Sequence, residues 1–148
     1  MAMVAAAVVA MIAWTWSRTP DVLEDYGREV YVPWRLSERA VLYRDINSFN
    51  GPLAPYLNAL LFKLSGPGIL TLKAFNAVLI AVLAAMMYRL VAAMADDFAA
   101  GVCGVVFAVM FGCQQVGGAT FNFLTPYSHD LTYGIALSMG MLLCLWRA

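Results

Sequence analysis

The chain has 148 residues, of which 63% are hydrophobic and only 12% are charged, and its nine basic and nine acidic side chains cancel. Soluble domains carry about 25% charged residues, so this composition argues against an ordinary soluble domain. The zero net charge also removes any electrostatic case for binding nucleic acid. Four apolar runs account for the composition, and they cover residues 2–16, 69–91, 98–116 and 131–146.

The first apolar run, 2–16, predicts a membrane anchor. A spanning helix needs about 20 apolar residues, with a lower limit of about 17, and the first and last runs are shorter than this. A cleaved signal peptide is the alternative, but the run has no basic start and no small-x-small site precedes Arg18. Because the two short runs lie at the two ends of the chain, we expect it to be part of a longer protein.

The long polar connection that follows, 18–67, is expected to carry its own helices, because unstructured loops of this length are uncommon. Its start, 19–21, reads Thr-Pro-Asp, which combines an N-cap, a proline suited to the first turn and an acid. We expect this helix to end at about Val32, because Pro33 opposes its continuation. Its amphipathic pattern suits a helix that lies on a membrane surface.

The second half of this connection predicts another helix. Residues 40–43 are expected to be extended or a turn, and Asn-Gly-Pro at 50–52 indicates a turn followed by a helix from 52 to about 64. Lys73 lies early in the next apolar run, and we expect it to snorkel to the interface. The prediction is an all-α polytopic membrane protein. It is one membrane domain, 1–148, with about four spans and membrane-parallel amphipathic helices in the first long loop.

The three cysteines lie in or beside apolar runs and form no CxxC pair, so they read as packing residues rather than as a metal or disulfide framework. The loop side of the four spans carries seven basic residues and the other side two. By the positive-inside rule this bias places the long loop in the cytoplasm.

Candidate chemistry lies in the long loop. Asp25 and Glu29 are four residues apart, so both carboxylates would face one way on a helix and repel mildly. A general base, a metal ligand or an arginine partner would justify that arrangement. The alternative is a solvated face with local ion pairs such as Arg35 with Glu38. Asp45 lies near a turn and could approach the same place.

A second candidate is the histidine of the connection between the third and fourth runs. His129-Asp130 lies on the same side of the predicted bundle as the long loop. It could therefore reach a common site, or it could be a hydrogen-bonded structural residue. No phosphate loop, HExxH or GxSxG motif is present.

Several motifs resemble membrane glycosyltransferases of the GT-C superfamily. They are Asp25-Tyr-Gly-Arg-Glu-x-Tyr, Leu42-Tyr-Arg-Asp-Ile, Gly51-Pro-Leu-x-Pro-Tyr-Leu-Asn-Ala and Phe121-Asn-Phe-Leu-Thr-Pro-Tyr-Ser. The chain is most similar to the branch of dolichyl-phosphate-mannose protein mannosyltransferases and bacterial lipid A aminoarabinose transferases. In that branch a first span leads into a long extracytoplasmic loop that bears an acid near its start and two membrane-parallel helices.

The resemblance implies an enzyme that transfers a sugar from a polyprenyl-phosphate donor to a glycan, lipid or protein acceptor on the extracytoplasmic side. By position, Asp25 would be the base that deprotonates the acceptor. The branch often has the two acids closer together, which leaves open whether Asp25 or Glu29 acts. Arg28 and Arg44 would hold phosphate, because guanidinium binds phosphate oxygens in a bidentate manner. The remaining predicted substrate-binding residues are Tyr43, Asp45 and His129.

The resemblance also implies a location and a boundary. We expect an integral protein of a bacterial inner (cell) membrane with the long loop extracytoplasmic, against the charge bias. No cofactor is required by this prediction, and a divalent cation is left open. Enzymes of this kind have about a dozen spans, so four spans would be the N-terminal portion of one. The alternative is a small four-span protein without catalysis that serves as an assembly partner or transporter subunit.

Overall fold

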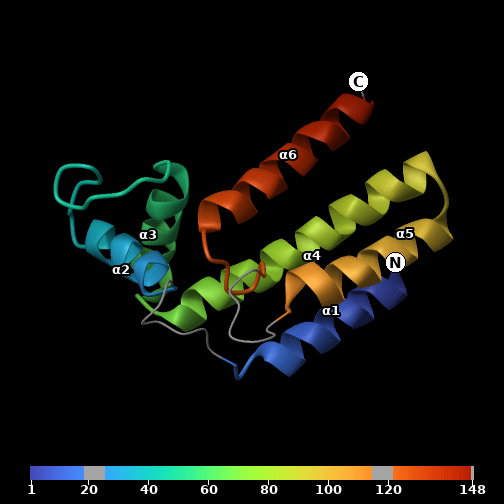
Figure 1. Cartoon of the computed structure of the whole chain (residues 1–148), viewed down its shortest axis with the longest axis horizontal. Coiled ribbons are helices and arrows are strands. Elements are labelled where there is room, and N and C mark those ends of the chain that lie inside the picture. Colours follow the sequence, from blue (N-terminus) through green and yellow to red (C-terminus); the bar gives the residue numbers. More distant parts are fainter. Residues whose placement is uncertain (19–25, 115–121, 148) are drawn as a thin grey trace.

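The computed structural model describes residues 1–18, 26–114 and 122–147. The helices in order are α1 (Ala2–Thr15), α2 (Tyr26–Ser37), α3 (Leu53–Ser65), α4 (Ile69–Met94), α5 (Asp97–Val106), the π-helix η1 (Phe107–Gly112) and α6 (His129–Arg147) (Figure 1). The described residues hold no strand, only an isolated bridge between Leu42 and Ile46. The prediction of an all-helical chain is confirmed.

Among the described residues, α4 is the one helix that is long and apolar enough to cross a membrane. Its 26 residues extend over about 39 Å at 1.5 Å per residue, more than the hydrocarbon core of about 30 Å. α1 is apolar but shorter, and so is the helix that α5 and η1 form together, Asp97–Gly112. The third run was expected to reach span length, but its helix ends at Gly112. The described residues thus establish one helix that is both long and apolar enough to cross a membrane, rather than four.

The helices α1, α4, α5 and η1 lie side by side, and we call them the apolar group (Figure 1). Asp96 begins α5 directly after α4 because its carboxylate accepts the N–H of Ala99 at 2.7 Å. α5 therefore returns along α4. The group packs around a buried cluster with members from α1, α4 and η1, among them Val4, Leu83 and Ala108.

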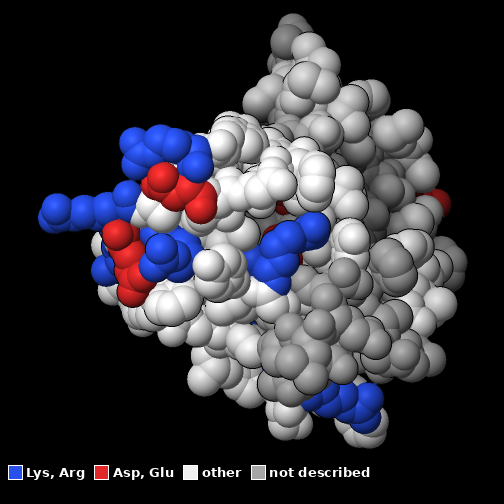
Figure 2. Space-filling view, turned by 60° about the vertical axis from the view of Figure 1, so that its left-hand side comes forward, with Lys and Arg blue, Asp and Glu red and all other residues white. Residues whose placement is uncertain are grey.

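The helices α2 and α3 pack on each other at one end of the molecule, beside the beginnings of α4 and α6 (Figure 1). Their contact buries Val32, Leu36 and Ala59 together with the two residues of the bridge. Figure 2 shows acidic and basic side chains interleaved over this end, among uncharged surface. The predicted second loop helix is confirmed to within one residue at each end.

Two local predictions were wrong. Helix α2 does not end at Val32 but continues through Pro33 to Ser37. Pro33 cannot donate to the carbonyl four residues earlier, yet it is buried between Val32 and Leu36, and this packing favours continuation over the lost hydrogen bond. The predicted start of the helix, 19–21, lies outside the described residues.

Lys73 does not snorkel to an interface. Its side chain is fully buried, and Nζ donates to the carbonyl oxygens of Trp16 at 2.6 Å and Arg18 at 2.8 Å. Helix ends leave such carbonyls without partners, so the ammonium caps the C-terminal end of α1. The start of α4 is thereby tied to the end of α1.

Candidate functional site

The centre of the candidate site is a pair between α2 and α6. Glu29 Oε2 accepts two hydrogen bonds from His129, from the backbone N–H at 3.0 Å and from ring Nδ1 at 2.6 Å. The His129 side chain is fully buried and that of Glu29 is 10% exposed. The first N–H groups of a helix lack partners within it, so Glu29 caps α6 from 100 residues away and its charge suits that positive end.

Asn76 of α4 closes the other side of the imidazole. Its Nδ2 lies 3.1 Å from His129 Nε2 and also donates to the Leu124 carbonyl at 3.1 Å. An amide nitrogen donates only, so Nε2 accepts and the ring proton lies on Nδ1, facing Glu29. This arrangement assigns His129 as the neutral imidazole beside an ionised Glu29.

Further buried polar side chains surround the pair. Tyr133 donates to Asn58 Oδ1 at 2.5 Å, which joins α6 to α3. The Tyr133 ring also lies 5.6 Å from the imidazole, and that of Tyr26 lies 6.3 Å from it. We call Glu29, Asn58, Asn76, His129 and Tyr133 the polar junction. The Tyr26 hydroxyl and Asn76 Oδ1 are buried without a hydrogen-bond partner among the described residues.

A small polar slot opens beside the polar junction. Its volume is about 20 Å³, and Arg28, Glu29, Asn50, Asn58 and Asp130 are among the residues that line it. About 10–15 Å³ is enough for one water molecule, so the slot admits one hydroxyl group but not a sugar ring.

The two carboxylates of the slot differ in their electrostatics. Burial acts to raise the pKa of Glu29, but the hydrogen bonds from the ring and backbone of His129, aided by the charge of Arg28, lower it below its usual value. Burial raises the pKa of Asp130, and the nearby charge of Glu29 raises it further. Glu29 is therefore held as a fully engaged anion, whereas Asp130 is the carboxylate that takes up a proton more readily.

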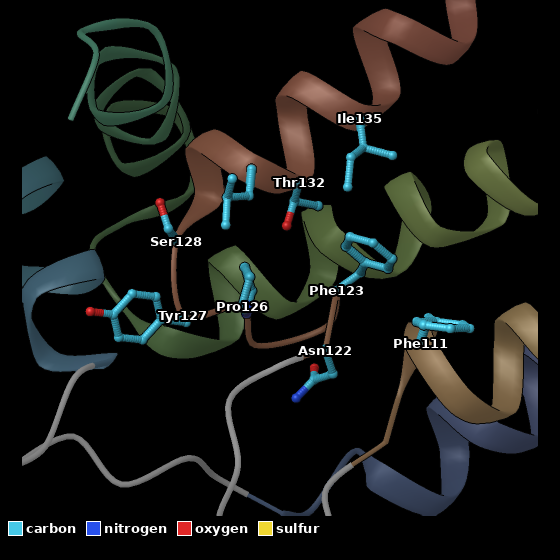
Figure 3. A pocket seen from close by; sticks show the side chains of 9 residues that line it. Phe111, Asn122, Phe123, Pro126, Tyr127, Ser128, Thr132 and Ile135 are labelled. Atoms are coloured by element: carbon cyan, nitrogen blue, oxygen red, sulfur yellow. The ribbon is translucent and has the colours of Figure 1, made fainter.

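An apolar cleft of about 190 Å³ lies beside the first turns of α6 (Figure 3). Thr132 and Ile135 project into it from α6, opposite Phe123 of the preceding connection (Figure 3). At the polar end, the Tyr127 ring lies 5.6 Å from the guanidinium carbon of Arg28, and Ser128 bonds to Asn50 at 3.4 Å. Tyr127 and Ser128 of the cleft thus contact Arg28 and Asn50 of the slot.

Among the predicted site residues, Arg28, Glu29 and His129 come together. Arg28 forms an ion pair with Glu29 at 3.5 Å and is 42% exposed, which leaves part of the guanidinium accessible. The proximity of His129 to the long loop is confirmed. Asp25 lies outside the described residues, and so does its predicted alignment with Glu29.

The other predicted residues lie apart from the polar junction. Arg44 and Asp45 form an exposed ion pair at 2.9 Å. The Arg44 hydrogen bonds and the Val41 N–H lower the pKa of Asp45 to about 2. Asp45 shares an open groove of about 430 Å³ with Arg28, which also lines the slot. Tyr43 donates to the Asn50 carbonyl at 2.5 Å, so its contact supports the loop.

Sequence reasoning missed three members of the polar junction: Asn58, Asn76 and Tyr133. A signal was available for Asn76, because an amide inside an otherwise apolar run is costly unless it is hydrogen-bonded. Asn58 and Tyr133 carried no comparable signal, because polar positions on amphipathic helices are usually solvated. The predicted ion pair of Arg35 with Glu38 is confirmed at 3.1 Å.

The described residues contain no group of three or more His, Cys, Asp or Glu side chains placed to hold a metal ion. All three cysteines are free. No protein-family model, curated protein or solved structure matches the chain. Function must therefore be argued from the site and from the sequence motifs.

Proposed function

We propose that the chain is the N-terminal part of a polytopic membrane glycosyltransferase that transfers a sugar from a polyprenyl-phosphate donor to an acceptor. In this proposal four apolar helices cross the bilayer, and the α2 and α3 end lies on the extracytoplasmic side. Helices α1, α5 with η1, and α6 from Leu131 onward cross as partners of α4. The motifs that resemble the GT-C superfamily motivate the proposal.

The observation that supports it best is an apolar cleft with a guanidinium packed on one of its lining residues. A polyprenyl-phosphate sugar has an apolar chain, an anionic linker and a polar head. The cleft beside Phe123 and Ile135 suits the first isoprene units, and Arg28, which packs on the Tyr127 ring, suits the phosphate. The slot beyond Arg28 would then receive the acceptor hydroxyl.

In this function the resemblance gives Asp25 the role of acceptor base. Glu29, the other candidate, is a poor base because His129 engages one of its oxygens and Arg28 the other. Arg44, Tyr43 and Asp45 would contribute from the rim of the open groove rather than from the slot. No divalent cation is needed for these roles.

The test is sugar transfer in membranes that contain the full-length protein, supplied with a labelled polyprenyl-phosphate sugar. We expect donor-dependent release of polyprenyl phosphate, and a large loss in Arg28→Met with the control Arg39→Met unaffected. Arg39 is exposed and lies outside the cleft and the slot. Membranes that never consume any such donor would support the alternative of a small protein without catalysis.

Orientation has its own test. Asn47 is exposed in the loop between α2 and α3, so a cysteine placed there is accessible to reagents. In a background without the three native cysteines, Asn47→Cys should react with an impermeant maleimide in intact cells. Reaction only after permeabilisation would put the loop in the cytoplasm, as the charge bias suggests.

A further inference from the structure

The slot contains a carboxylate for which neither the sequence motifs nor the resemblance provides a role. Asp130 is the second residue of α6, half-buried, and lines the slot with Arg28, Asn50 and Asn58. Ser128 Oγ lies 3.5 Å from its Oδ2, which is a long contact, and the Asn50 side chain also hydrogen-bonds to the carboxylate. Neither partner is charged, so of the two described acids of the slot Asp130 is the less strongly engaged.

The polar junction fixes where this carboxylate sits. Glu29 binds both the backbone N–H and the ring of His129, the residue immediately before Asp130. Asn76 holds the opposite edge of the same ring. The first turn of α6 is therefore fixed against α2 and α4, and Asp130 with it. Precise placement of a reactive group relative to its substrate is what such supporting contacts provide.

We propose that Asp130 accepts the proton of the acceptor hydroxyl, and that Glu29 and His129 are the positioning residues that hold it at the slot. This inference rests on the proposed glycosyl transfer and names the base among the described residues. It competes directly with the assignment of that role to Asp25.

The reaction balances as a single displacement. The acceptor O–H proton moves to a carboxylate oxygen of Asp130 while the acceptor oxygen forms a bond to the anomeric carbon. The bond from that carbon to the phosphate oxygen breaks, and its electron pair leaves on the phosphate. Arg28, which lines the same slot, faces the charge that develops there. Asp130 then returns its proton to water.

The pKa shifts of the two carboxylates agree with a base role for Asp130 and a positioning role for Glu29. The charged and titratable groups around Asp130 are Glu29 and Arg28 from α2, with His129 and Tyr133 from α6, while α3 contributes the uncharged Asn58. Burial and the Glu29 charge raise the pKa of Asp130, which brings it closer to the range in which a general base is efficient. The lowered pKa of Glu29 has the opposite effect on that side chain.

The decisive experiment compares Asp130→Asn, Asp25→Asn and Glu38→Gln in the transfer assay with saturating donor. We expect Asp130→Asn to lower kcat by about 10²–10⁴-fold, the usual cost of losing a positioned base, and to remove the acid limb of the kcat–pH profile. Asp25→Asn should keep that limb. Glu38 is exposed and pairs with Arg35, so Glu38→Gln should match the wild type.

Two results would overturn the assignment. One is near-normal transfer by Asp130→Asn. The other is a large loss in Asp130→Asn with the acid limb intact, because Asp130 would then serve only the fold. For the positioning residues, Glu29→Gln should lower kcat less than Asp130→Asn and shift the acid limb without removing it. Loss of the limb in Glu29→Gln, with the limb kept in Asp130→Asn, would make Glu29 the base.

A readout without turnover separates this inference from the proposed function. Dicyclohexylcarbodiimide modifies protonated carboxyl groups in apolar surroundings, and mass spectrometry identifies the modified residue. Across a pH series in membranes, labelling of Asp130 should persist to higher pH than labelling of Glu29. The reverse order would contradict the inference even if sugar transfer is observed. Suppose that the labelling follows the expected order but the wild type transfers no sugar. The proposed function and the catalytic role of Asp130 would then be refuted, and only the raised pKa of its carboxyl group would be supported.

Discussion

The apolar group and the polar junction are held together by different forces. In the apolar group, helices pack through aliphatic and aromatic side chains, and close approach depends on small residues such as Gly104 against Val4. In the polar junction, α2, α3, α4 and α6 meet through directed hydrogen bonds between residues up to 100 positions apart. Helices packed through apolar side chains can shift slightly along one another, whereas directed hydrogen bonds fix the helices in one relative position. The junction is thus the part suited to hold reactive groups.

The largest expected effect comes from removing the histidine of the junction. His129→Ala removes the ring hydrogen bond to the nearly buried Glu29 carboxylate, which keeps only the backbone N–H, and leaves a cavity in place of a fully buried ring. A hydrogen bond to a charged group contributes about 1.5–3 kcal/mol, and truncating a large buried side chain to alanine costs about 2–5 kcal/mol. Hydrogen exchange in detergent should accelerate in α2 and the first turn of α6, while α4 and α5 stay protected. Equal acceleration in the polar junction and the apolar group would mean that the two regions unfold as one cooperative unit.

The same region should respond to acid through Glu29. Its pKa is lowered in the folded protein, so its stabilisation is present above the ordinary value of 4.5 and is lost as the pH falls through the lowered value. The raised pKa of Asp130 has the opposite effect, because protonation of Asp130 at low pH favours the folded protein. The difference between wild type and Glu29→Gln isolates the first effect, and we expect acid-induced exchange in α6 only when Glu29 is present. An identical acid response in both proteins would exclude Glu29 as its source.

The next effect probes the contact between α1 and α4. Lys73→Met removes the ammonium from the carbonyls at the end of α1, and hydrogen bonds to charged groups contribute about 1.5–3 kcal/mol. The melting temperature in detergent should fall, with faster exchange at the end of α1. Lys63→Met is the matched control, because Lys63 is exposed on α3. Equal melting temperatures for the two variants would show that the cap is not stabilising.

Packing in the apolar group is tested at Gly104. A Cβ there would lie 2.6 Å from Val4 Cγ2, so Gly104→Leu forces α1 and α5 apart. Overpacking costs about 1–3 kcal/mol, and the melting temperature should fall while the junction keeps its exchange protection. Gly134→Ala in α6 meets nothing within 4 Å and should be neutral or slightly stabilising. A stable Gly104→Leu would show that α1 and α5 can separate without loss.

The smallest effect is expected at the exposed charges of the α2 end. Arg35 and Glu38 are each nearly half exposed, and ion pairs of this kind contribute at most about 1 kcal/mol. Arg35→Met should leave the melting temperature almost unchanged at physiological salt. A fall as large as that of Lys73→Met would mean that this pair belongs to the structural network.

The sequence by itself determined the helical architecture. Apolar runs and the Asn-Gly-Pro turn are local signals, so α1, α3, α4 and α6 could be placed within a few residues, as could the start of α5. The loop prediction failed at Pro33, because the packing of Val32 and Leu36 on α3 is not local. Lys73 was misjudged for the same reason, since its partners lie 55 to 58 residues away.

For the site, the sequence indicated Arg28, Glu29 and His129 as candidate catalytic or binding residues. It could not predict that their side chains contact one another in the folded protein. Only the tertiary structure placed Glu29 on the first N–H of α6 and supplied Asn76 from within an apolar helix. It also gave two carboxylates that composition treats alike different hydrogen-bond partners and opposite pKa shifts. The physical reason is that the pKa and the accessibility of a carboxyl group depend on burial and on partners from distant segments, and folding alone brings those together.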